Sequence, residues 1–106
     1  MNRTTFFRFA GAAITAAIFA LSLLPGPDLP DVPGGDKWHH SLAYFACMFC
    51  WGQAFVRPVQ RLKLAILFVG MGALIECLQY FTATRSFEVM DMVANALGVI
   101  AAWFVV

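Results

Sequence analysis

Four long apolar segments dominate this chain, and the short polar connections around them hold nearly every ionisable side chain. They cover approximately residues 6–24, 38–56, 64–81 and 89–106, each near the ~20 residues that a helix needs to cross a bilayer. An apolar content of 61% and a mean hydropathy of +0.77 exclude an ordinary soluble globule. We therefore predict an all-α, four-transmembrane-helix bundle that forms a single membrane domain over residues 1–106.

The charged residues are distributed unequally between the two ends of these segments. Arg3 and Arg8 flank the first segment, and three more cations, Arg57, Arg61 and Lys63, follow the second. The positive-inside rule then places both termini in the cytoplasm, in a multi-pass protein of the cytoplasmic membrane. On this topology all six carboxylates face outward: Asp28, Asp31, Asp36, Glu76, Glu88 and Asp91.

Charge and cysteine content argue against several other functions. The net charge of +1, without a basic run, gives no case for binding nucleic acid. Cys47, Cys50 and Cys77 lie inside apolar segments, so we expect them to pack rather than to form disulfides. The sequence contains no compact metal-ligand motif such as His-x-x-x-His, and we predict neither a metal nor another cofactor.

Polar side chains recur on one face near the outer end of each of the last three segments. Lys37, His40 and Tyr44 occupy positions i, i+3 and i+7, which lie along one side of a helix. The third segment carries Glu76 and Gln79, three residues apart, and the fourth carries Asp91 and Asn95, four residues apart. Arg85 lies in the short loop between these two segments. The candidate ligand-binding residues are Lys37, His40, Tyr44, Glu76, Gln79, Arg85, Asp91 and Asn95.

Glu76 is the most costly of these residues to place in lipid. A carboxylate at the bilayer centre carries a penalty of roughly 2.5–3.5 kcal/mol on insertion scales, and such groups usually face the bundle interior beside a partner. Arg85 is a candidate counter-ion or bidentate anion binder. If the site is catalytic, the candidate acid–base residues are His40, Glu76 and Asp91. We expect the first segment to add only an apolar wall.

Three further polar residues are better placed to cap helices than to bind a ligand. Asp36 precedes the second segment, and Ser86 and Glu88 precede the fourth. Short polar side chains accept hydrogen bonds from free backbone N–H groups at a helix start, and carboxylates favour the positive end of the helix dipole. We therefore predict capping roles for all three.

The polar residues, taken in order, resemble a known family. The pattern is Asp36-Lys37-x-x-His40-x-x-x-Tyr44, then Glu76-x-x-Gln79, then Arg85-Ser86-x-Glu88-x-x-Asp91-x-x-x-Asn95-x-x-Gly98. It is similar to that of the VanZ-like family of small bacterial membrane proteins and spans most of the chain. The resemblance implies a bacterial inner-membrane location. It also implies a link to the cell envelope, because the name-giving member is associated with resistance to the glycopeptide antibiotic teicoplanin.

Three readings of the polar cluster stay open at this point. The first is a site that binds an anionic or amphiphilic envelope molecule, such as a precursor or glycolipid, with membrane lipid as a further partner. The second is an enzyme acting on a lipid-linked or peptidoglycan-related substrate. The third is a structural ion-pair and hydrogen-bond network. A channel is disfavoured because the inner halves of three segments contain no ionisable residue that could continue a polar route.

The charge distribution makes a direct prediction about topology. A reporter fused after Val106 should be cytoplasmic, and a cysteine placed at Pro30 should react with a membrane-impermeant thiol reagent. The reason is that five cations lie at the predicted inner end, against Lys37 and Arg85 at the outer end. A reporter on the outer side together with a protected cysteine would contradict the topology and the outward-facing site.

Overall fold

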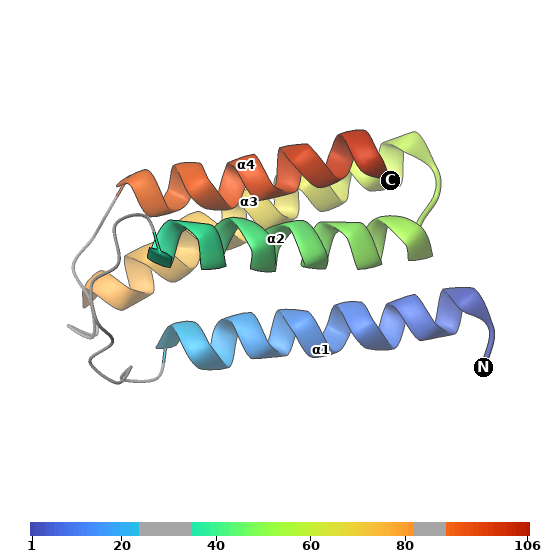
Figure 1. Ribbon diagram of the computed structural model, residues 1–106, viewed down its shortest axis with the longest axis horizontal. Coiled ribbons are helices and arrows are strands. Elements are labelled where there is room, and N and C mark those ends of the chain that lie inside the picture. Colours follow the sequence, from blue (N-terminus) through green and yellow to red (C-terminus); the bar gives the residue numbers. More distant parts are fainter. Residues whose placement is uncertain (24–34, 82–88) are drawn as a thin grey trace.

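The computed structural model describes residues 1–23, 35–81 and 89–106, with the side chains of residues 35–37 left out. It contains four helices that run alternately up and down (Figure 1): α1 (Arg3–Leu23), α2 (Gly35–Ala54), α3 (Pro58–Phe81) and α4 (Val89–Val105). No strand occurs among the described residues, so the all-α prediction is confirmed. Both termini lie at the same end of the bundle as the connection between α2 and α3.

The starts of α1 and α3 are determined by a capping residue and a proline, which the hydropathy pattern does not identify. Asn2 caps α1, because its Oδ1 accepts a hydrogen bond of 2.8 Å from the backbone N–H of Thr5. α3 begins at Pro58, about a turn and a half before the expected start at Leu64. Proline suits the first helical position, where its missing N–H costs nothing. The expected start of the third segment at residue 64 was therefore too late, since residues 58–61 form the first turn of α3.

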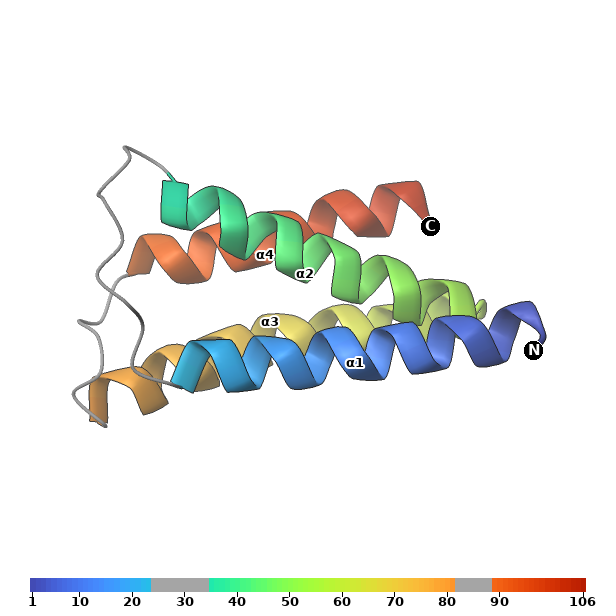
Figure 2. The same cartoon turned by 60° about the horizontal axis from the view of Figure 1, so that its bottom comes forward.

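The helices pack in two layers that the chain order does not suggest. α2 makes its most extensive contact with α4, and Figure 2 shows this pair in one layer above α1 and α3. α1 packs mainly on α2 and α3 mainly on α4, with only a small contact between α1 and α3. α3 contacts α4 and, less extensively, α2. The α2–α4 contact is thus the centre of the bundle.

Glycine and serine allow α2 and α4 to approach closely. A Cβ atom at Gly98 would collide with the carbonyl oxygen of Ser41 and lie 3.1 Å from the backbone nitrogen of Phe45. Ser41 Oγ donates a hydrogen bond of 2.7 Å to the carbonyl oxygen of Ala94 across the same contact. Small residues at helix crossings are typical of packing in lipid, where close van der Waals contact and interhelical hydrogen bonds favour helix association.

A second polar contact joins α1 to α2. Trp51 Nε1 donates to Thr15 Oγ1 at 3.1 Å, and Thr15 Oγ1 donates to the carbonyl oxygen of Gly11 at 2.8 Å. The Trp51 ring lies against Gly11, where an added Cβ would meet it at 2.8 Å. The sulfur of Cys47 lies 3.3 Å from the same hydroxyl. Cys47 therefore packs within this contact, as expected from its place in an apolar segment.

This bundle buries polar side chains and exposes large apolar ones to an extent that is unusual for a soluble protein. Glu76, Gln79 and Asn95 are almost fully buried, while large apolar side chains such as Phe104 and Leu21 are 82% and 70% exposed. Soluble monomers rarely expose contiguous apolar surface on this scale. The longest dimension of 40 Å matches the ~40–45 Å of a bilayer with its headgroups. The surface is suited to lipid.

Two of the four helices meet the length and composition expected of a membrane span. These are α1, with 21 residues, and α3, with 24 residues. α4 is apolar but has 17 residues, and α2 carries polar side chains along its outer half. Length and composition thus identify two candidate spans, and the arrangement with four spans remains a prediction.

The glycine at the α2–α4 contact supports a stability prediction. Gly98→Ala should lower the free energy of unfolding by about 1–3 kcal/mol, because overpacking forces the helices apart. Gly70→Ala is the matched control, since an added Cβ there meets nothing within 4 Å. It should be neutral or stabilise the helix by up to about 1 kcal/mol. Thermal unfolding of the purified protein in detergent measures both, and equal melting temperatures would contradict the close contact.

Candidate functional site

A hydrogen bond between α2 and α4 lies at the centre of the candidate site. His40 Nδ1 and Asn95 Oδ1 are 3.1 Å apart. In the tautomer with its proton on Nδ1, the ring donates to this amide oxygen and Nε2 carries a lone pair. His40 is only partly buried, whereas Asn95 is 3% exposed. The imidazole can therefore accept a hydrogen bond from a bound molecule while Asn95 fixes its orientation.

α3 contributes two buried polar side chains to the same half of the bundle. Glu76 and Gln79 are each 1% exposed. Glu76 lies one turn beyond Gly72, where an added Cβ would meet Asn95 Nδ2 at 2.9 Å, so α3 and α4 are in direct contact beside the site. Tyr44, also buried, is close enough to Glu76 to interact with it electrostatically. The expected polar stripes of α2, α3 and α4 thus face a common interior.

Gln79 also connects the site to α1. Its Nε2 donates a hydrogen bond of 2.6 Å to the carbonyl oxygen of Ser22. The expectation that the first helix adds only an apolar wall is therefore wrong, because a backbone carbonyl near the end of α1 accepts this bond. A carbonyl in the last turn of a helix lacks an intrahelical partner and is available to an outside donor. The sequence pattern could not reveal this contact.

Asp91 stands apart from the other polar groups of the cluster. It lies in the first turn of α4, one turn before Asn95, where the helix dipole favours a negative charge. Its Oδ1 is buried and has no hydrogen-bond partner within the part of the chain that the structure describes. A buried polar atom normally has a partner, so this oxygen is an acceptor available to something outside the described chain.

Several predicted site residues lie wholly or partly outside the described structure. The backbone of Asp36 and Lys37 belongs to the first turn of α2, but their side chains are not described. Arg85, Ser86 and Glu88 fall in the segment 82–88, which lies outside the described residues. The capping predictions and the proposed anion-binding roles of Lys37 and Arg85 therefore remain predictions.

The geometry gives no support to a metal centre. No three His, Cys, Asp or Glu side chains group as metal ligands among residues 1–23, 35–81 and 89–106. His40 Nδ1 is hydrogen-bonded to Asn95, and the neighbouring Ser41 hydroxyl is bonded to the carbonyl oxygen of Ala94. The arrangement is suited to hydrogen bonding with a polar molecule.

Sequence reasoning missed one polar residue beside the site. Ser41 follows His40 and joins α2 to the backbone of α4 through its hydroxyl. Its position inside an apolar segment could have identified it, because serine side chains commonly hydrogen-bond across helices in lipid. Its effect is to hold the two helices in the register that brings His40 to Asn95.

Comparison with known proteins agrees with the polar pattern. A family profile described as VanZ/LLP1 matches residues 5–106, which is essentially the whole chain. No curated protein and no solved structure matches it. Together with two helices suited to span a bilayer, the family match indicates a membrane protein. The order and spacing of the polar residues had implied the same family, and the chain belongs to the VanZ/LLP1 family.

Proposed function

We propose that this protein is a four-span protein of the bacterial cytoplasmic membrane whose outward-facing polar cluster binds an anionic or amphiphilic cell-envelope molecule. The cluster consists of the described residues His40, Tyr44, Glu76, Gln79, Asp91 and Asn95, with Lys37 and Arg85 as its proposed cations. Both termini and five cations lie at the opposite end, which the positive-inside rule assigns to the cytoplasm. The cluster would then face the envelope.

The observation that carries this proposal is the unpartnered oxygen of Asp91. A packing network in lipid would be expected to satisfy its buried acceptors internally, since each unsatisfied group in hydrocarbon is costly. Asp91 Oδ1 lacks a partner in the described chain although Ser41, Asn95 and Gln79 each have one. A ligand hydroxyl, amide or ammonium donor would satisfy this oxygen.

The cluster combines groups suited to the two ends of an amphiphilic molecule. His40 Nε2 and Asp91 Oδ1 are acceptors for hydroxyl or amide donors of a sugar or peptide headgroup. Lys37 and Arg85 are the proposed partners of phosphate or carboxylate groups. The apolar sides of the helices would contact the lipid tail, which fits a precursor or glycolipid of the envelope.

A second candidate function is an enzyme acting on a lipid-linked or peptidoglycan-related substrate. The hydrogen bond from His40 Nδ1 to Asn95 favours this alternative, because it leaves Nε2 with the lone pair that a general base needs. Asp91 or Glu76 would then serve as the partner acid, and Arg85 would stabilise developing negative charge. Turnover of a supplied substrate by the purified protein distinguishes this alternative from binding alone.

Substitution of Asp91 separates a binding site from a structural network. Asp91→Asn keeps the volume and removes the charge, so a site predicts loss of function with little change in stability. The phenotype is the teicoplanin susceptibility of bacteria that overexpress the protein. We expect it to return to the level of the empty vector, while the melting temperature in detergent shifts by less than about 4 °C, or about 1 kcal/mol.

Glu76→Gln, like Asp91→Asn, should abolish the phenotype with little change in melting temperature. Thr15→Val is the control, because it removes a polar group outside the cluster. Thr15 is hydrogen-bonded at the α1–α2 contact, so its loss should lower the melting temperature but keep the phenotype. In a purely structural network, breaking a buried pair costs about 3–5 kcal/mol. A parallel fall in stability and phenotype for Asp91→Asn and Glu76→Gln would therefore refute the binding site.

A further inference from the structure

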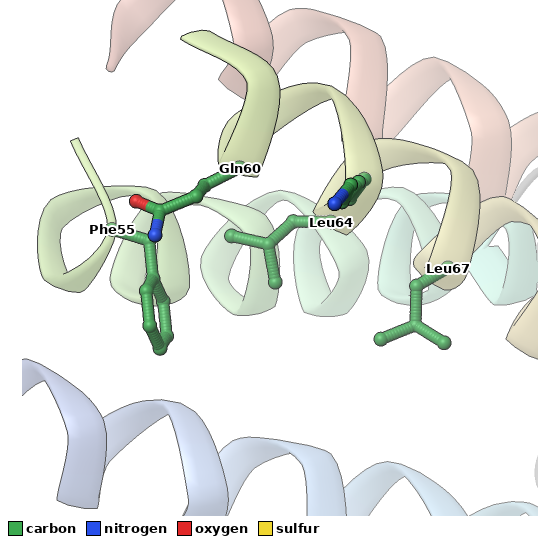
Figure 3. Close-up of a pocket in the computed structure, with 5 residues that line it drawn as sticks. Phe55, Gln60, Leu64 and Leu67 are labelled. Carbon is green, nitrogen blue, oxygen red and sulfur yellow. The ribbon is translucent and has the colours of Figure 1, made fainter. Parts of the chain in front are cut away.

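Two open hollows follow α3 on the side that faces α1, away from the polar cluster. The first, of about 340 Å³, is lined by Phe55 after the end of α2 and by α3 side chains from Gln60 to Leu67. Figure 3 shows Gln60, Leu64 and Leu67 of α3 and Phe55 of the α2 end on the side that faces α1. Leu67 also lines a second cavity of about 550 Å³, which extends as far as Leu74. Because Leu67 lines both, the two hollows adjoin along α3, and together we call them the α1–α3 groove.

The dimensions of the α1–α3 groove suit a lipid chain. From Gln60 to Leu74 it follows α3 for about 21 Å at 1.5 Å per residue. One leaflet of a ~30 Å hydrocarbon core is about 15 Å thick, so a chain anchored at one surface can lie along the groove. The wall contributed by α1 includes Phe19 and Thr15. The hydroxyl of Thr15 is already bonded to Gly11 and Trp51, and the groove interior is otherwise mainly apolar.

One end of the groove is positively charged. Lys63 lines this end beside Gln60, is exposed, and makes no ion pair or hydrogen bond within the described chain. Arg8 adds a second cation, because its guanidinium carbon lies 5.2 Å from the ring centre of Phe55, which forms part of the wall. No aspartate or glutamate occurs before residue 28 or between residues 37 and 75. This end therefore attracts an anion without a competing acidic side chain.

The other cations at this end are differently placed. Arg61 Nε donates to the carbonyl oxygens of Gly52 and Phe55, at 3.0 and 3.3 Å, and so satisfies free carbonyls at the end of α2. Arg3 is hydrogen-bonded to Gln53. Arg57 is exposed and does not line the groove. Lys63 is thus the cation best placed to bind a group at the mouth of the groove.

We propose that the α1–α3 groove binds one anionic phospholipid of the inner leaflet, with its phosphate at Lys63 and Arg8 and an acyl chain along α3 toward Leu74. An apolar path that ends in uncompensated cations complements a phosphate group attached to a hydrocarbon chain. The inference depends on the membrane location but is independent of the polar cluster. The effect of Asp91→Asn on the phenotype therefore does not test the lipid site in the groove.

Native mass spectrometry of the full-length protein in detergent tests this proposal with defined lipids. The protein is mixed with palmitoyl-oleoyl phosphatidylglycerol or with the zwitterionic phosphatidylcholine of the same chains, and retained lipid is counted. We expect one phosphatidylglycerol to be retained in preference to phosphatidylcholine. Lys63→Gln should weaken its retention about fivefold, the factor expected for one lysine near an anionic membrane surface. Arg57→Gln is the matched control with the same charge change and should retain lipid as the unmodified protein does.

A second variant tests the acyl-chain path without altering charge. Gly70 lines the groove, and an added Cβ would meet nothing within 4 Å, so Gly70→Leu fills the path without disturbing helix contacts. It should reduce phosphatidylglycerol retention at least as much as Lys63→Gln. Ala101→Leu, at an exposed position of α4 outside the groove, is the control for added bulk. Equal retention of the two lipids, or unchanged retention in both Lys63→Gln and Gly70→Leu, would overturn the proposal.

Discussion

The close approach of α4 to α2 brings together His40 and Asn95, the hydrogen-bonded pair at the centre of the candidate site. At Gly98 the two backbones come so near that a methyl group would strike the carbonyl oxygen of Ser41. The hydroxyl of Ser41 bonds to the backbone of α4 at the same level, which fixes the register of the two helices. One turn toward the outer end, Asn95 then meets His40 at 3.1 Å. A wider crossing would separate this pair and leave both groups without a partner in an apolar interior.

Lipid explains why several polar side chains are buried while many large apolar side chains are exposed. In hydrocarbon, helices gain little from hiding apolar surface, so close packing and hydrogen bonds hold them together. Glu76 and Asn95 are therefore buried at the helix contacts, whereas Phe104 faces outward. The polar groups also concentrate toward one end, and five of the seven cations lie at the other. Each end of the bundle therefore has a different chemistry, with most hydrogen-bond acceptors at one end and most positive charge at the other.

The sequence was sufficient to predict the four helices, the family and the inward-facing polar residues, because periodic spacing alone places His40, Glu76 and Asn95 on helix faces. It could not predict the extensive α2–α4 contact, since that contact depends on the fit of Gly98 against a backbone far away in the chain. The early start of α3 was missed because charged residues after Pro58 resemble a loop in a hydropathy pattern, although they continue the helix. Backbone acceptors such as the Ser22 carbonyl have no signature in the side-chain pattern.

A crystal structure grown from lipidic mesophase, with the native lipids retained during purification, shows whether the polar cluster holds a bound molecule. We expect non-protein density within hydrogen-bond distance of Asp91 Oδ1 and on the Nε2 side of His40. We also expect Lys37 and Arg85 to approach the same density. Protein side chains that close over Asp91 and complete its hydrogen bonds, with no room for a bound molecule, would contradict the binding site and leave the cluster as a structural network.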